Sequence, residues 1–133
     1  MKYLVDTNVL IHLCNSKSPM LERKFTSRMP EEFAVSAITV GELIYGANKS
    51  VHKERNLQAI LRILSPLKVI DFDSGDGWQY GEIRADLERA GRVIGGNDML
   101  IAAQARRRGL VVITSNTKEY VRVPGLTVQD WTR

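Results

Sequence analysis

The sequence is poor in the residues that stabilise or anchor proteins outside the cytoplasm. Cys14 is the only cysteine among 133 residues, so an internal disulfide and a cysteine-based zinc site are both excluded. No apolar run reaches the roughly 18–20 residues that span a bilayer. Asp6 interrupts the apolar start, where a secretory signal would need a continuous apolar core. We therefore expect a cytoplasmic protein without a membrane segment, in which Cys14 is a buried structural thiol.

The residues of two common kinds of active site are also scarce. The chain contains no Gly-x-x-x-x-Gly-Lys-Ser/Thr loop, which argues against a P-loop nucleotidase. His12 and His52 are the two histidines, and neither has a second potential zinc ligand at the usual spacing. We expect His12 to pack within a helix and His52 to be exposed, which argues against a zinc hydrolase.

Basic residues exceed acidic ones. Nineteen Lys and Arg against fifteen Asp and Glu give a formal charge of +4, which suits a polyanionic partner. Many of the basic residues recur along helical-looking stretches, at 23–28, 49–55, 84–92 and 106–108. A solvated helix face explains any one of these clusters, whereas binding of an RNA backbone would require several of them together.

The pattern of apolar residues predicts an α/β fold. Short β-branched runs alternate with longer amphipathic ones, as in a parallel sheet flanked by helices. We expect one domain over residues 1–133 with a central parallel sheet of four to five strands. The expected strands are 2–5, 33–37, 68–72, 110–114 and, at the edge, 126–128. The expected helices are 20–29, 42–47, 54–64, 78–90 and 98–108.

Four acidic residues occupy special places in this predicted frame. Asp6, Glu42 and Glu119 each follow a strand, and Asp98 opens a helix. Ligands of an open parallel sheet bind beyond the carboxyl ends of its strands, so we expect these four acids to converge. Each acid has a simpler explanation as a helix cap. Ser, Thr or Asn would serve equally well as caps, and this favours a shared chemical role for the acids.

A cluster of carboxylates requires a counter-charge. Two carboxylates about 4 Å apart repel each other by roughly 4 kcal/mol at an effective dielectric near 20, so either some are protonated or a metal neutralises them. An all-oxygen site suits Mg²⁺ or Mn²⁺. Such ions activate water and neutralise the charge that develops at phosphorus. The predicted reaction is therefore hydrolysis of a phosphodiester.

The same residues resemble the motifs of a known family. Segments 5–11 (VDTNVLI), 39–47 (TVGELIYGA) and 94–103 (IGGNDMLIAA) are similar to the three motifs of PIN domains. Segments 112–120 (VITSNTKEY) and 123–126 (VPGL), with Asp130 and Trp131, resemble the VapC toxins of type II toxin–antitoxin pairs. The likeness covers essentially the whole chain, in the expected order.

The resemblance implies an activity and a set of partners. It implies an endoribonuclease that depends on Mg²⁺ or Mn²⁺ and that cuts transfer RNA in several relatives. It also implies a cognate VapB-like antitoxin, whose tail covers the active site and often presents an arginine, and a homodimer. The apolar side chains expected to line the antitoxin groove, or else to belong to the core, are those of Leu10, Leu13, Leu43, Ile44 and Tyr45.

The resemblance also implies roles for individual residues. Asp6, Glu42 and Asp98 match the three core acids, which hold the metal. The family often has Asp where this chain has Asn116, so we expect Glu119 to act as the fourth acid.

Further residues would support these acids or bind the RNA. Thr7, Asn8 and Thr114 are expected to orient the acids through hydrogen bonds, with Asn116 as a neutral or water-mediated contact. The candidates for gripping RNA are Arg84, Arg92 and Arg106, although the triple arginine 106–108 could instead only stabilise its helix end. Two alternatives remain: a PIN fold that binds RNA or a protein without cutting, and a metal-dependent phosphatase. The phosphatase would favour Asp at the place of Asn8.

Overall fold

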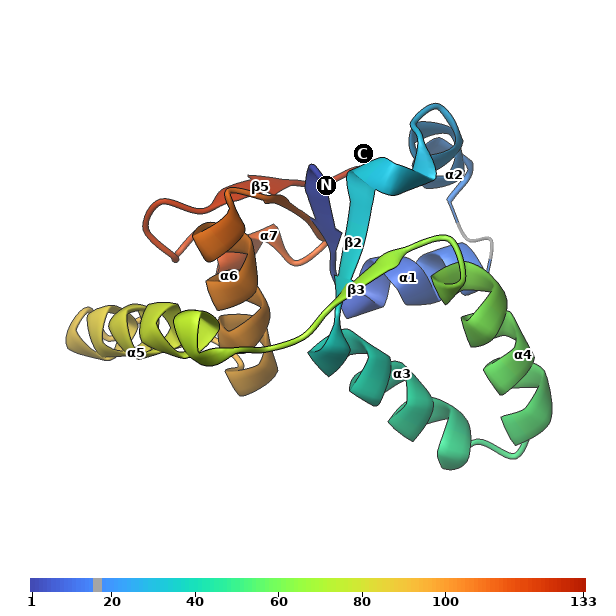
Figure 1. Cartoon of the computed structure of the whole chain (residues 1–133), viewed down its shortest axis with the longest axis horizontal. Helices are drawn as coiled ribbons and strands as arrows, with labels where there is room; N and C mark the ends of the chain where they lie inside the picture. Colours follow the sequence, from blue (N-terminus) through green and yellow to red (C-terminus); the bar gives the residue numbers. More distant parts are fainter. Residues whose placement is uncertain (16–17) are drawn as a thin grey trace.

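Five short parallel strands form the centre of the described protein (Figure 1). The structure is a computed structural model that describes residues 1–15 and 18–133. The strands are β1 (Tyr3–Val5), β2 (Phe33–Ser36), β3 (Lys68–Ile70), β4 (Val111–Ile113) and β5 (Thr127–Gln129). They lie in the order β3-β2-β1-β4-β5, all parallel. The predicted fold class is confirmed, with β1 at the centre and β5 at one edge as expected.

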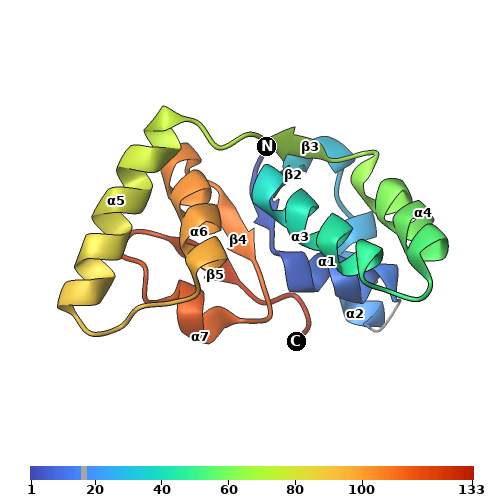
Figure 2. The ribbon, with the colours of Figure 1, turned by 90° about the horizontal axis from the view of Figure 1, so that it is seen from below.

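Helices cover both faces of this sheet. The helices are α1 (Thr7–Cys14), α2 (Pro19–Thr26), α3 (Ala37–Asn48), α4 (Lys53–Leu64), α5 (Ser74–Arg89), α6 (Gly96–Arg108) and α7 (Thr117–Tyr120), with a 3-10 turn at Pro30–Glu32. Figure 2 shows α1 to α4 on one side of the strands and α5 to α7 on the other. A bilayer-spanning helix is not found among the residues that the structure describes.

Successive residues of β1 point into two different apolar clusters. Leu4 packs in the cluster formed with α5, α6 and α7, which we call the α6 core. Tyr3 and Val5 pack in the opposite cluster, which is formed with α1 to α4. This alternation is the two-residue period of a strand, and it explains why β1 is apolar throughout.

Two helices begin earlier than the sequence predicts. Helix α3 begins at Ala37, directly after β2, because the Ser36 side chain accepts a hydrogen bond from the Ile38 amide and caps the helix. Helix α5 begins at Ser74, because Asp73 and Asp76 form a reciprocal capping box. Polar residues and glycines in these first turns obscured the apolar period on which the prediction depended. The other predicted helices and strands agree with the structure to within a few residues at each end.

Candidate active site

Asp6 is the central acid of the site. It follows β1 directly and caps α1, because its Oδ1 accepts a hydrogen bond from the Thr7 amide at 2.8 Å. Its Oδ2 accepts a second hydrogen bond from the Thr114 hydroxyl at 2.8 Å. Asp6 is 3% exposed, and burial raises the pKa of its carboxyl although these hydrogen bonds oppose the effect. The capping explanation is therefore correct for Asp6, but it leaves the burial of the charge unexplained.

Asp98 and Glu119 meet at the same edge of the sheet. Asp98 lies in the first turn of α6, and Glu119 lies in α7. Burial, a hydrogen bond with Glu119 and the charge of Asp6 raise the pKa of Asp98 to about 7. The same hydrogen bond lowers the pKa of Glu119. The contact therefore favours the neutral form of Asp98 and the ionised form of Glu119.

Asn116 supports Glu119 instead of capping α7. The Asn116 side-chain amide donates a hydrogen bond to Glu119 Oε2 at 2.8 Å. Its backbone amide donates to the Thr114 hydroxyl at 2.9 Å. The cap that the sequence suggested for Glu119 is therefore wrong, since Asn116 is the N-cap residue and its side chain makes no capping hydrogen bond. The pair joins Glu119 to the same threonine that holds Asp6.

Glu42 reaches the site from α3. The Thr7 hydroxyl donates to Glu42 Oε1 at 2.7 Å and lies 3.0 Å from the Thr39 hydroxyl. The negative charge of Glu42 contributes to the raised pKa of Asp6. Because α3 begins at Ala37, Glu42 lies beyond the first turn, and its simpler explanation as a helix cap is wrong. All four predicted acids thus converge, while Asn8 is exposed on α1.

Tyr120 is the member of the cluster that the sequence did not reveal. It ends α7, is fully buried and places its hydroxyl 3.2 Å from Asp6 Oδ1 and 3.1 Å from Asp98 Oδ1. Burial and the charges of these carboxylates raise its pKa, so it remains a neutral phenol. A lone aromatic residue after a polar turn is typical of core packing. The only signal in the sequence was its position next to Glu119.

The arginines expected to bind RNA differ in their surroundings. Arg84 is exposed on α5, where it forms an ion pair with Glu88. Arg92 is exposed after the same helix. Arg106 donates to the Gln79 side chain at 2.6 Å and to a backbone carbonyl of the loop before β5. The structure thus gives Arg106 a role in holding α6 against α5, and its contact with RNA stays a prediction.

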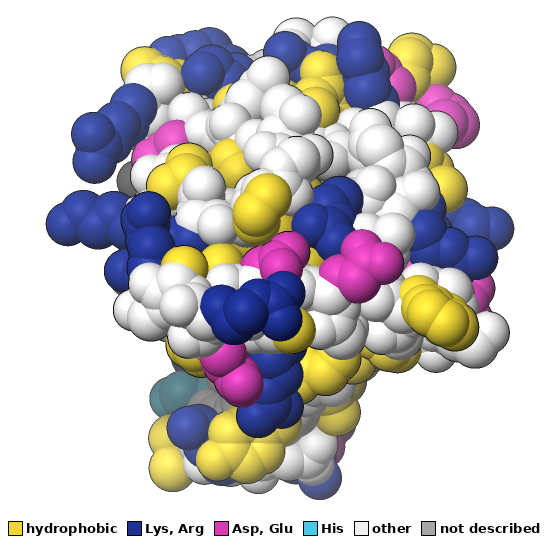
Figure 3. Space-filling model, turned by 90° about the vertical axis from the view of Figure 1, so that its left-hand side faces the viewer, with side chains coloured by type: hydrophobic (Ala, Val, Ile, Leu, Met, Phe, Trp, Pro, Cys, Tyr) yellow, Lys and Arg dark blue, Asp and Glu magenta, His cyan; other side chains and the backbone are white. Residues whose placement is uncertain are grey.

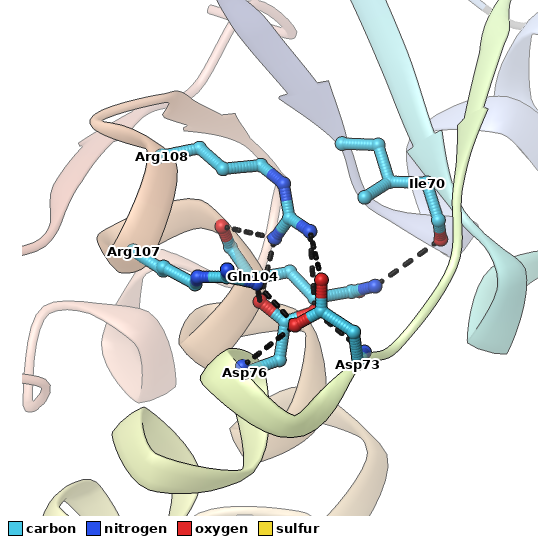
Figure 4. Close-up of polar contacts among 6 residues, drawn as sticks. All are labelled: Ile70, Asp73, Asp76, Gln104, Arg107 and Arg108. Carbon is cyan, nitrogen blue, oxygen red and sulfur yellow. Dashed lines mark hydrogen bonds and ion pairs between the residues drawn. The ribbon is translucent and has the colours of Figure 1, made fainter.

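Arg107 and Arg108, the other two arginines of the run 106–108, hold α6 against the start of α5 (Figure 4). Arg108 donates to the fully buried Asp76 at 2.6 Å, and Arg107 forms an ion pair with Asp73. This contact lowers the pKa of Asp73 to about 2. The two side chains therefore bind carboxylates at the start of a neighbouring helix. This role goes beyond stabilising the C-terminal end of α6 itself.

Cys14 and the two histidines were assigned no catalytic part. Cys14 is half-buried, where a buried thiol was expected, and burial raises its pKa. His12 is half-buried on α1, and His52 is exposed before α4, as predicted.

The donor chemistry of the cluster fits a hard divalent cation. Its groups are all oxygens, and burial together with the neighbouring acids raises the pKa of Asp98. Among residues 1–15 and 18–133, no three acidic, His or Cys side chains already surround one point. Mg²⁺ requires no such cage, because one or two carboxylates and several waters usually hold it. Asp6 and Asp98, which flank one hydroxyl, are the pair best placed to do so.

Comparison with known proteins agrees with this combination of a parallel sheet and clustered acids. The model of the PIN domain family matches residues 3–126. A crystal structure of DNA-bound VapBC from Salmonella typhimurium contains a chain that superposes with a TM-score of 0.93, at 40% identity and with 98% of each chain covered. The fold and the acids thus define a nuclease of the PIN class.

Curated relatives narrow this class. The tRNA(fMet)-specific endonuclease VapC of Salmonella typhimurium is 42% identical over 134 residues, and that of Shigella flexneri is 40% identical over 131 residues. The alignments cover 98% of this chain and 98% of each relative. The chain therefore belongs to the PIN-domain family and, within it, to the VapC ribonucleases.

Proposed function

We propose that this chain is the toxin of a type II toxin–antitoxin pair, an endoribonuclease that hydrolyses RNA phosphodiester bonds with Mg²⁺ or Mn²⁺. The observation that carries the proposal is the convergence of Asp6, Glu42, Asp98 and Glu119 at one edge of the sheet. PIN-domain VapC nucleases are generally dependent on a divalent metal. An oxygen-only cluster with excess negative charge is the kind of site that such metals occupy.

The four acids would share two tasks in the proposed reaction, which are holding the cation and activating the water. Asp6 and Asp98 would hold the cation together with Glu42, and the cation supplies a more acidic water and neutralises charge on the phosphate. Thr114 and the Thr7 amide orient Asp6. Glu42 or Glu119 would steer the attacking water and accept its proton, because both carboxylates are more accessible than Asp6.

Transfer RNA is the substrate that we propose. Two relatives of about 40% identity are named as tRNA(fMet)-specific endonucleases. The chain carries a net charge of +4, which suits a polyanionic partner. Figure 3 shows the face at the α5 end, where Lys and Arg side chains lie around and between acidic ones. We retain Arg84, Arg92 and Arg106 as the candidates for phosphate contacts.

A VapB-like antitoxin is the proposed protein partner. The similar structure from Salmonella typhimurium is of a VapBC complex. In this chain a groove between α1, α3 and α4 is lined by Ile11, Leu43 and Ala59 and by the basic Arg55, and it includes Glu42 of the site. An antitoxin segment with apolar and acidic residues would fit this groove and lead to the acids. We further propose a homodimer and a cytoplasmic location, where RNA and antitoxin are both found.

The test is cleavage of purified tRNA by protein freed of its antitoxin, with Mg²⁺, Mn²⁺ or EDTA. We expect discrete fragments with either metal and none with EDTA. Asp98→Asn should abolish cleavage, whereas Asp86→Asn, which removes an exposed ion pair with Arg89 on α5, should leave it unchanged. Sequencing of the fragment ends identifies the bond.

The same assay separates the ribonuclease from a PIN fold that only binds. A binding module would retain tRNA in a filter assay but leave it intact under all three conditions. Cleavage that persists in EDTA and in Asp98→Asn would rule out the proposed metal chemistry.

A further inference from the structure

A single buried tyrosine links the α6 core to the carboxylate cluster. Tyr120 packs its ring in that core with no exposed surface. Its hydroxyl lies 3.2 Å from Asp6 Oδ1 and 3.1 Å from Asp98 Oδ1. These acids come from separate elements, the β1–α1 junction and the first turn of α6. One oxygen atom therefore contacts both carboxyls.

The packing of the ring fixes the place of this hydroxyl. A close-packed side chain keeps its rotamer, so the phenol oxygen has little freedom to move. A buried hydroxyl is costly unless it is hydrogen-bonded, and here both potential acceptors are carboxyls of the site. A phenylalanine would fill the same space in the core. The oxygen atom is thus not needed for packing, and its contribution is made to the two acids.

Asp98 depends on this contact more than Asp6 does. Asp6 is held by the Thr7 amide and the Thr114 hydroxyl in addition to Tyr120. Asp98 contacts Tyr120 and the carboxyl of Glu119. A carboxyl that binds a cation must be ionised, and an ionised Glu119 then repels it. The Tyr120 hydroxyl remains as a neutral donor beside Asp98.

We propose that Tyr120 is a positioning residue, whose hydroxyl donates its single hydrogen bond to the Asp98 carboxylate and so keeps Asp98 beside Asp6, at the spacing at which one divalent cation binds both. This inference rests on the proposed function and adds a residue to its site. Loss of a group that orients metal ligands typically weakens metal binding by about 10- to 100-fold. The hydroxyl should therefore affect the affinity for metal in the absence of any RNA.

The test is calorimetric titration of the full-length, antitoxin-free protein with Mn²⁺. Tyr120→Phe removes one oxygen, and we expect its dissociation constant for Mn²⁺ to rise about 10-fold. The matched control is Tyr3→Phe. Tyr3 is 7% exposed, and its hydroxyl accepts a hydrogen bond from Arg28 on the opposite face of the sheet. This control should bind Mn²⁺ as the unaltered protein does.

The possible outcomes separate this inference from the proposed function. Equal Mn²⁺ affinity in Tyr120→Phe and the unaltered protein overturns the role of Tyr120 alone. A variant that fails to fold overturns it too, because the hydroxyl would then be required for the fold.

If the unaltered protein binds no Mn²⁺, the proposed metal chemistry fails. A metal-free crystal structure of Tyr120→Phe then decides the positioning role. An Asp98 carboxyl that is displaced in this variant supports the positioning role, and one that keeps its place refutes the role.

Discussion

Replacing Asp98 by Asn should stabilise the metal-free protein while it removes activity. The pKa of Asp98 is raised from 3.8 to about 7 by burial, Glu119 and Asp6. An acid whose pKa is raised in the folded state stabilises that state below pH 4. This contribution is lost as the pH rises through 7. At pH 8 the ionised Asp98 therefore destabilises the fold, and a neutral amide avoids the cost.

The gain in stability expected for Asp98→Asn at pH 8 follows from how far the pKa of Asp98 is raised. About three pKa units correspond to an upper limit of about 4 kcal/mol. Asp98 is only partly buried, so solvent screening should reduce the gain to about 1–2 kcal/mol. For a domain of this size that raises the melting temperature by about 3–8 °C.

Thermal unfolding in EDTA at pH 8 and pH 4.5 measures this difference. We expect Asp98→Asn to melt above the unaltered protein at pH 8, with a much smaller gap at pH 4.5. Excess Mg²⁺ at pH 8 should raise the melting temperature of the unaltered protein more than that of the variant. The exposed-site variant Asp86→Asn should follow the unaltered protein throughout. An Asp98→Asn protein less stable at pH 8 than the unaltered one would refute the reasoning.

Three further substitutions test other contacts of the structure. Thr7→Val removes the donor to Glu42, so tRNA cleavage should fall about 10- to 100-fold; an unchanged kcat would show that Glu42 needs no such support. Asp76→Ala leaves the arginine pair of α6 without its buried partner, which should cost about 3 kcal/mol in urea unfolding, and a loss below about 1 kcal/mol would contradict that role. In Gly95→Ala the new Cβ would lie 3.2 Å from Asp98 Oδ2. The affinity for Mn²⁺ should then fall with little change in melting temperature. An affinity equal to that of the unaltered protein would show that the Asp98 side chain can move aside without losing the metal.

Most of the sheet was predictable from the sequence because its signals are local. A run such as 2–5 is apolar at every position and too short for a helix, which predicts a central strand. Gly109 was a correct helix stop, since its left-handed backbone (φ 65°) favours glycine. The starts of α3 and α5 were missed, because their caps depend on Ser36 and Asp73, which precede no clear apolar period.

The candidate site was predictable in outline for a topological reason. Carboxyl ends of parallel strands meet at one edge, so acids placed just after strands must approach one another. The sequence could not predict the hydrogen bonds among them. Thr7 and Glu42 are 35 residues apart, and Tyr120 and Asp6 are 114 apart. Such contacts depend on how the helices pack on the sheet.

The sequence by itself determined the α/β class, the central place of β1 and the set of four acids, because strand period and chain order carry that information. Only the tertiary structure decided the raised pKa of Asp98 and the place of the Tyr120 hydroxyl between two carboxyls. It also assigned Arg107 and Arg108 to partners on α5. Burial and electrostatic coupling depend on distances between atoms far apart in the chain, and these distances exist only once the two faces of the sheet are packed.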